Sequence, residues 1–322
     1  MTARDEATLA AYSIGWRAVR MMPEKTAYRT FDVIADRLWK RHGNGVTQLE
    51  NNLRRVRPEA TDSEIRELSR LGMRSYFRYW CDAFRISDWS PERIVGTFKC
   101  EDEHYLSDAV AEGNGVVIAL GHMGNWDHAG GWGALDMGPL TAIAERLKPE
   151  KLFRKFVAYR ESLGIRIHPA GQPGVVNVLA EELRNEGRIV ALLADRDLGR
   201  RGISVQLFGE ETRMPAGPAY LALRTGAPLI VATLWYDGPN ACAKMHARIP
   251  IPEGAPTGDD ASTQPGYEQA VAEITQKVAH VFEEGISAHP QDWHMLQKLW
   301  LADLDQARLA KSDAVKSSEE LD

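Results

Sequence analysis

The sequence has few cysteines and no long hydrophobic run. Its three cysteines, Cys81, Cys100 and Cys242, are far apart and form no C-x-x-C pair. This usage argues against a disulfide framework and against a cysteine zinc site. The most apolar runs cover residues 115–120, 189–194 and 228–235, whereas a membrane-spanning helix needs about 20 apolar residues. We therefore interpret these runs as buried β-strands.

Other signatures are also missing. The N-terminal segment MTARDEATLAAY is charged and lacks the apolar centre of a secretory signal, so we expect a cytoplasmic protein, free or bound to a membrane face. The sequence contains neither a G-x-S-x-G nucleophile elbow nor a P-loop. A serine-nucleophile hydrolase and a kinase are therefore weakly supported.

The charge of the chain is uneven. The 322 residues are 44% hydrophobic and 26% charged, and the formal net charge is −6, which is typical of a folded chain with a sizeable core. Residues 10–57 contain ten Lys or Arg and four Asp or Glu, so this segment carries +6 and the remainder −12. We expect no nucleic-acid partner, and we expect the helix containing Trp16 and the basic residues 17–57 to dock on an anionic membrane surface.

The hydrophobic periodicity changes after residue 98. Helices are predicted over 8–42 with a break at Pro23, over 48–56, and from the Thr61 capping signature to residue 85. Strands are predicted at 116–120, 141–144, 165–168, 188–193, 205–208, 229–236 and 242–249, with helices between most of them. This alternation predicts an α/β fold with a central, mostly parallel or mixed β-sheet flanked by helices. We expect one domain over residues 1–304, made of a helical lead (1–97) and an α/β core (98–304), and a disordered tail at 305–322.

The segment Gly121–His128, GHMGNWDH, is the most informative for chemistry. It follows an apolar strand directly, and ligands of α/β proteins gather at the carboxyl ends of strands. His122 can act there as a general base, because an imidazole takes a proton near neutral pH. Asp127 can hold the other ring nitrogen if the loop turns between the two residues. On an ideal helix they would lie about 140° apart, so the pairing requires non-helical backbone at His122.

Two alternatives remain open for this segment. A His and an Asp within six residues also occur by chance, with no catalytic meaning. His122, Asp127 and His128 could instead bind a metal in a hydrolase, although the sequence offers no second cluster of ligands.

Two further stretches carry polar residues at predicted strand ends. Asp195 and Arg196 follow the strand at 188–193, and Glu210 and Arg213 follow the turn at 208–209. An arginine next to carboxylates can bind a phosphate or a polyol. A surface cluster of ion pairs is the alternative interpretation.

Together these motifs resemble the glycerol-3-phosphate and lysophospholipid acyltransferase superfamily. His122…Asp127 resembles its H-x-x-x-x-D motif, and F-x-E-x-T-R at Phe208–Arg213 resembles its third motif, with Glu211 at a usual glycine. The strand after Pro228 resembles the fourth motif. The segments GHMGNWDHAGGW, AERLKP, ADRDL and FGEETRMPAGPA resemble more closely the lipid A biosynthesis acyltransferase branch, in particular its actinobacterial phosphatidylinositol mannoside acyltransferases. The resemblance covers about residues 10–300.

The resemblance implies a fold, an activity and residue roles. It implies a glycerol-3-phosphate acyltransferase-like fold and transfer of a palmitoyl-type chain from acyl-CoA to a mannose hydroxyl of a phosphatidylinositol mannoside, by a peripheral enzyme on the cytoplasmic face of the plasma membrane. It implies no metal and no cofactor besides the co-substrate acyl-CoA. His122 would be the general base and Asp127 its motif partner. Asp195, at a position usually occupied by Glu, would contact the histidine or the acceptor. The substrate-binding residues would be Glu145, Arg160, Arg196, Glu210, Arg213 and Trp126.

The chemistry of a thioester then suggests a direct transfer. His122 would deprotonate the sugar hydroxyl and no acyl-enzyme would form, while backbone N–H groups near Gly121–Asn125 are candidates for the oxyanion hole. Trp126, Trp132 and Phe153 are candidate liners of an acyl groove. An acyltransferase that acts on a lysophospholipid or another glycolipid, a metal-dependent hydrolase and a non-enzymatic lipid-binding module remain the alternatives.

Overall fold

The computed structural model of the chain describes residues 3–146, 148–197 and 202–304. The tail expected to be disordered, 305–322, lies outside the described residues. The strands are β1 (Phe98–Glu101), β2 (Val116–Leu120), β3 (Leu140–Ala144), β4 (Ile165–Pro169), β5 (Ile189–Leu193), β6 (Ile203–Leu207), β7 (Glu210–Met214), β8 (Leu229–Asp237) and β9 (Asn240–Met245). The helices are α1 (Ala3–Met21), α2 (Glu24–Arg41), α3 (Asn44–Val56), α4 (Asp62–Arg85), α5 (Pro91–Gly96), α6 (His104–Ala111), α7 (Trp126–Trp132), α8 (Glu150–Glu161), α9 (Val175–Glu186), α10 (Gly217–Thr225) and α11 (Tyr267–Ala288).

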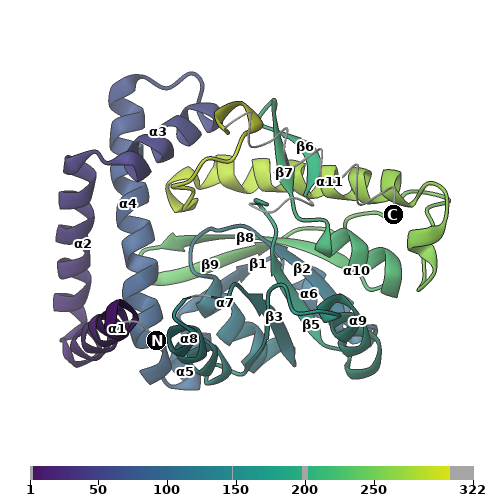
Figure 1. Cartoon of the computed structure of the whole chain (residues 1–322), viewed down its shortest axis with the longest axis horizontal. Helices are drawn as coiled ribbons and strands as arrows, with labels where there is room; N and C mark the ends of the chain where they lie inside the picture. The colour runs from purple at the N-terminus through teal and green to yellow at the C-terminus, as the bar shows by residue number, and fades with distance from the viewer. Residues whose placement is uncertain (1–2, 147, 198–201, 305–322) are drawn as a thin grey trace.

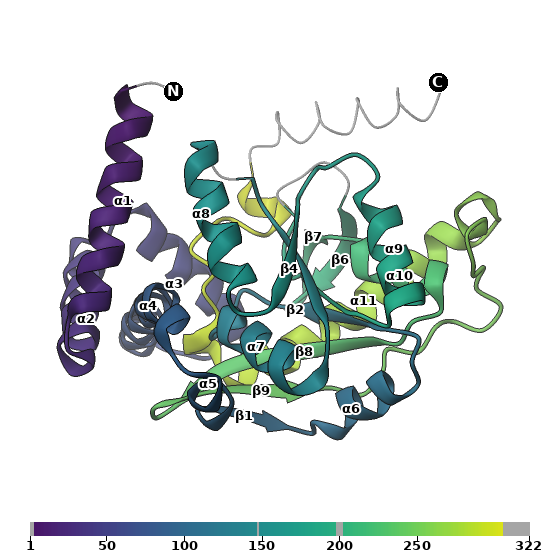
Figure 2. The same ribbon diagram turned by 90° about the horizontal axis from the view of Figure 1, so that it is seen from below.

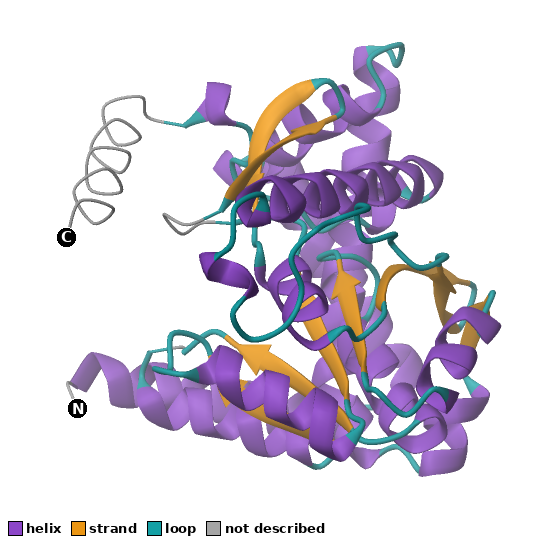
Figure 3. Ribbon diagram, turned by 90° about the vertical axis from the view of Figure 1, so that its right-hand side faces the viewer, coloured by secondary structure: helices purple, strands orange, loops and turns teal. Residues whose placement is uncertain are grey.

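Seven strands form one mixed sheet in the order β1-β9-β8-β2-β5-β3-β4. All neighbours are parallel except β8 and β9, which form an antiparallel hairpin. Helices α6, α7 and α8 cover one face, and α9, α10 and α11 cover the other, as the two helix layers around the strands show (Figure 3). The predicted α/β fold with a helix-flanked sheet is confirmed.

The N-terminal helices stand at one side of this sandwich (Figure 1). Helix α4 begins with the predicted capping box, because the Thr61 hydroxyl accepts the Glu64 N–H at 3.3 Å and the Glu64 carboxylate accepts the Thr61 N–H at 2.8 Å. Trp16 of α1 is buried and packs against Phe84 of α4 and Phe156 of α8, as the proximity of these helices in Figure 2 indicates. Trp16 therefore belongs to the core and is not part of a membrane-facing surface.

Several elements differ from the sequence-based expectation. The predicted strand at 242–249 is β9, which ends at Met245. Strands β1 and β7 and helices α5 and α7 were not predicted, because each has at most seven residues and shows no clear period. Within the described ranges, no helix combines the length and the apolarity needed to cross a membrane.

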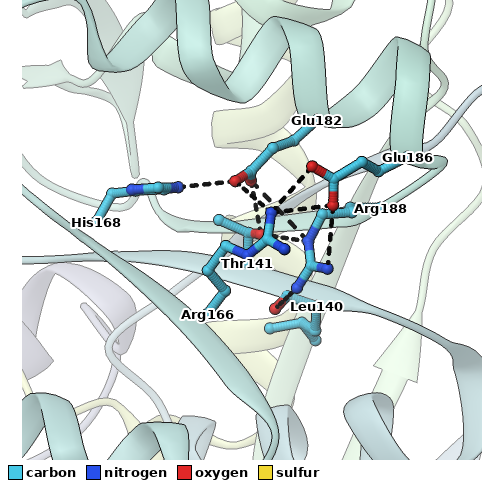
Figure 4. A network of polar contacts seen from close by, with 7 residues as sticks. All are labelled: Leu140, Thr141, Arg166, His168, Glu182, Glu186 and Arg188. Atoms are coloured by element: carbon cyan, nitrogen blue, oxygen red, sulfur yellow. Dashed lines mark hydrogen bonds and ion pairs between the residues drawn. The ribbon is translucent and has the colours of Figure 1, made fainter.

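A buried polar network fixes α9 to the edge of the sheet (Figure 4). The Glu182 carboxylate of α9 accepts hydrogen bonds from Arg166 on β4 at 2.8 Å and from Thr141 on β3 at 2.7 Å, and it lies 2.9 Å from a ring nitrogen of His168. Arg188, just before β5, donates to Thr141 and to the Leu140 carbonyl. One carboxylate thus joins α9 to two neighbouring strands of the sheet.

Candidate active site

The register of the sheet places His122 next to Asp195. Strands β2 and β5 are parallel neighbours in which Leu120 is paired with Leu193, so the residues two positions beyond each strand lie side by side. The Nδ1 atom of His122 lies 2.6 Å from Oδ1 of Asp195, and the His122 backbone N–H donates to Oδ2 at 2.9 Å. Asp195 is fully buried, whereas the His122 side chain keeps 21% of its surface exposed. The pair therefore forms an imidazole–carboxylate dyad that opens towards solvent.

Asp195 is held as an anion by its surroundings. Burial alone would raise the pKa of this carboxyl group, but the positive charge of His122 and three hydrogen bonds, two from His122 and one from Trp293, lower it below its usual value. An ionised Asp195 at Nδ1 fixes the ring proton on that nitrogen and leaves Nε2 as the basic atom.

Asp127 does not orient His122, contrary to the prediction. It lies in the first turn of α7, where its Oδ1 accepts the Arg160 Nε–H at 2.7 Å and its Oδ2 accepts the Tyr79 hydroxyl at 3.0 Å. The reason is local: α7 begins at Trp126, because the Asn125 side chain caps it by accepting the His128 N–H at 2.9 Å. This start turns the Asp127 carboxylate towards α4 and α8. The neighbour of the histidine is Asp195, as the resemblance allowed.

The loop from Gly121 to Gly124 is pinned at its backbone. The N–H groups of His122, Met123 and Gly124 donate to Asp195, Gly121 and Asp292 respectively. These three N–H groups are therefore already used in hydrogen bonds within the protein. For them, the prediction of an oxyanion hole built from the Gly121–Asn125 backbone is wrong. Gly124 has φ +50°, and a Cβ there would lie 2.8 Å from the Trp235 backbone nitrogen of β8, so only glycine fits this close approach.

An apolar cavity lies beside the dyad, between the sheet and α7. Trp126, Asp127 and Arg160 form its polar part, and most of the remaining lining is aliphatic, with contributions from β2, β3, β5 and β8. Trp126 lies edge-on to His122, with ring centroids 5.8 Å apart, and it connects the dyad with the cavity. Trp132 also lines the cavity, as predicted, whereas Phe153 is buried in the core and is not among the lining residues.

The other predicted binding residues come from different elements of the fold. Glu145 is exposed directly after β3, and Arg196 follows Asp195 and donates to Gln297. Glu210 forms an ion pair with Arg55 at 2.9 Å. The Arg213 carbonyl on β7 accepts the Asp197 N–H at 2.9 Å, which places this strand beside the loop after β5.

The geometry does not bring together the three residues of the alternative metal site, His122, Asp127 and His128. His128 is buried, its Nε2 lies 2.8 Å from the Ile94 carbonyl oxygen, and burial lowers its pKa to about 4. Across residues 3–146, 148–197 and 202–304, no group of three or more His, Cys, Asp or Glu side chains is arranged to hold a metal ion.

The sequence interpretation missed the C-terminal contribution to the site. Trp293 donates to Asp195, and the His294 N–H donates to the His122 carbonyl at 2.8 Å. His294 itself is buried, with its pKa lowered to about 3 by burial and by the charge of His122. The dense run of aromatic and polar residues over 289–300, HPQDWHMLQKLW, was the available signal.

The chain is similar to known proteins over nearly its whole length. The model of the bacterial lipid A biosynthesis acyltransferase family matches residues 3–302. The chain belongs to this family. It is 41% identical over 308 residues to a phosphatidylinositol mannoside acyltransferase of Mycolicibacterium smegmatis, an alignment that covers 95% of each chain. It is also 41% identical over 314 residues to the protein of the same name in Mycobacterium tuberculosis, with 95% of this chain and 92% of the relative covered.

Proposed function

We propose that this protein transfers a fatty acyl chain from acyl-CoA to a mannose hydroxyl of a phosphatidylinositol mannoside. The observation that carries the proposal is the His122–Asp195 dyad beside an apolar cavity. In addition, the chain aligns over nearly its whole length with proteins named phosphatidylinositol mannoside acyltransferase. The acceptor is a membrane lipid, so we place the enzyme peripherally on the cytoplasmic face of the plasma membrane.

The dyad supports a direct transfer. Nε2 of His122 takes the proton of the mannose hydroxyl as that oxygen attacks the thioester carbonyl, and the Asp195 carboxylate stabilises the imidazolium that forms. The tetrahedral intermediate collapses when the carbon–sulfur bond breaks, and the imidazolium returns the proton to the leaving CoA thiolate. One ester bond forms and one thioester bond breaks, with no covalent acyl-enzyme and no metal in the sequence of steps.

The cavity supports the choice of an acyl donor. A saturated chain buried among aliphatic side chains gains about 0.8 kcal/mol for each CH₂ group removed from water. We place the part of the chain next to the thioester in this cavity, whose volume is about 80 Å³, with the thioester near Trp126, which borders both the cavity and His122.

We place the polar acceptor at the exposed side of His122. Glu145, Arg196 and Arg213 come from the ends of β3 and β5 and from β7, and they can donate to or accept from sugar hydroxyls and the lipid phosphate. Arg160 and Glu210 form ion pairs with Asp127 and Arg55. We therefore assign them support of the site rather than direct contact with the acceptor.

Radiolabelled palmitoyl-CoA and vesicles that contain mannosylated phosphatidylinositol test the proposal directly. The wild-type protein should form labelled acylated mannoside, and His122→Ala and Asp195→Asn should each lose about 10²–10⁴-fold in kcat. His104→Ala, at an exposed histidine of α6, is the matched control and should retain full activity. Transfer to lysophospholipid alone would replace the proposed acceptor, and full transfer by His122→Ala would refute the mechanism.

A further inference from the structure

The segment that follows α11 lies directly on the catalytic loop. Met123 and Trp293 form an antiparallel bridge, the Gly124 N–H donates to the Asp292 carbonyl at 2.9 Å, and the His294 N–H donates to the His122 carbonyl at 2.8 Å. These backbone hydrogen bonds hold residues 292–294 in a fixed position against residues 122–124.

This pairing delivers the Trp293 indole to the buried carboxylate. Trp293 is fully buried, and its Nε1–H donates to Oδ2 of Asp195 at 3.1 Å. The same oxygen accepts the His122 backbone N–H at 2.9 Å, and the other carboxylate oxygen lies 2.6 Å from Nδ1 of His122. With two donors on Oδ2, the carboxylate can present Oδ1 to the imidazole in one orientation only.

We propose that Trp293 is a positioning residue of the acyl-transfer centre, whose indole N–H holds the Asp195 carboxylate in register with His122. This inference rests on the proposed function for its effect on turnover, but the contact itself does not depend on the substrate. Trp293 belongs to none of the motifs named above, and its role in this proposal is to position the catalytic pair.

The electrostatic setting explains why a donor is needed at this place. Burial opposes a charge on Asp195, and the hydrogen bond from Trp293 is among the interactions that lower its pKa. Among the described residues, the titratable groups that interact electrostatically with this carboxylate are His122 and the buried His294, whose pKa of about 3 keeps it neutral. His294 therefore supplies no positive charge that could replace the lost donor.

Trp293→Phe removes the N–H and keeps an aromatic ring, and Trp300→Phe is a closely matched control. Trp300 is also fully buried, lies edge-on to Trp293 with centroids 6.1 Å apart, and donates its Nε1–H to the Leu207 carbonyl at 3.0 Å. We expect Trp293→Phe to lower kcat by about tenfold to a hundredfold, because it removes a hydrogen bond to a charged group. The KM for acyl-CoA should stay within about twofold, and Trp300→Phe should stay within about threefold of wild type in kcat.

Two readouts separate positioning from simple packing. The acidic limb of kcat/KM should move to higher pH in Trp293→Phe, because a carboxylate with one donor fewer holds the proton of the coupled pair more tightly. The low-field proton resonance of His122 Nδ1–H, assigned by its loss in His122→Ala, should shift in Trp293→Phe and stay unchanged in Trp300→Phe. Benzothienyl-alanine at position 293 keeps the indole shape without the N–H, and it should reproduce both changes even if the Phe variant folds poorly.

The outcomes distinguish the two proposals. If wild-type protein transfers acyl chains and the benzothienyl variant matches it in rate, pH profile and resonance, the positioning role of Trp293 is wrong. If wild-type protein transfers no acyl chain to any acceptor, the proposed function is wrong. In that case the resonance alone decides whether Trp293 acts on the His122–Asp195 pair.

Discussion

At the scale of single residues, Asp127 has a structural role that the H-x-x-x-x-D motif does not indicate. Its carboxylate is 3% exposed and pairs with the Arg160 guanidinium, whose side chain is 20% exposed. The Tyr79 hydroxyl completes the arrangement. A buried ion pair of this kind is costly to break, because the remaining charge stays buried without a partner.

We expect Asp127→Asn to lower the free energy of unfolding by about 2–4 kcal/mol, since Arg160 then loses its counter-charge. Arg160→Gln should cost a similar amount, and the double variant should cost clearly less than the two single changes together. Urea unfolding of the four proteins gives the coupling. Arg154→Gln, which breaks the exposed ion pair with Glu150 on the same helix, is the control and should leave the unfolding midpoint in place. Additive effects of Asp127 and Arg160 would contradict this assignment.

The local sequence pattern predicts His122 at a strand end, whereas Asp195 was indicated as a possible neighbour only by the family resemblance. An apolar run followed by a Gly-rich segment is a local pattern, and it correctly predicts a histidine at the end of a strand. The pairing with Asp195 depends on the order of the sheet, because β5 inserts between β2 and β3. Trp293 is still harder to predict, since it is 98 residues from Asp195 along the chain and is brought there by backbone pairing. Local patterns carry no information about such contacts.

At the scale of elements, α9 depends on one carboxylate. Glu182 is 4% exposed, and its hydrogen bonds from Arg166, His168 and Thr141 outweigh burial and lower its pKa (Figure 4). A carboxyl group whose pKa is lowered on folding stabilises the protein above its unfolded-state pKa. This stabilisation is lost as the pH falls through the folded-state pKa.

We expect Glu182→Gln to destabilise the protein by about 1–3 kcal/mol at pH 7, because it weakens several charged hydrogen bonds in the interior. The difference from wild type should shrink as the pH is lowered below about 4.5. Glu182 is protonated first in the unfolded chain and, at lower pH, also in the folded protein. Urea unfolding at pH 7 and pH 4 measures both effects. Glu186→Gln changes the same helix at a side chain that is 45% exposed, and it should have a much smaller effect. A Glu182→Gln difference that is constant with pH would contradict the argument.

At the scale of the whole molecule, the basic N-terminal region divides into two kinds of residue. Arg20, Arg54 and Arg55 form ion pairs with acidic residues of the protein. By contrast, α2 exposes five basic residues that form no ion pair within the described part of the chain, Lys25, Arg29, Arg37, Lys40 and Arg41. The same helix also exposes Val33, Ile34 and Leu38. We therefore propose α2, rather than the surroundings of Trp16, as the membrane-facing surface.

This surface should bind anionic lipid through its charge, with about 1 kcal/mol contributed by each basic residue near the membrane. We expect Arg37→Glu/Arg41→Glu to weaken binding to vesicles of phosphatidylglycerol and phosphatidylcholine by at least about tenfold, and added salt should weaken wild-type binding in the same direction. Co-sedimentation measures both. Lys99→Glu/Lys244→Glu makes the same change in net charge at exposed residues of β1 and β9, so it should bind within about twofold of wild type. Equal losses of binding in the two double variants would mean that net charge, rather than the face of α2, governs binding. Binding that is insensitive to salt would exclude an electrostatic mechanism.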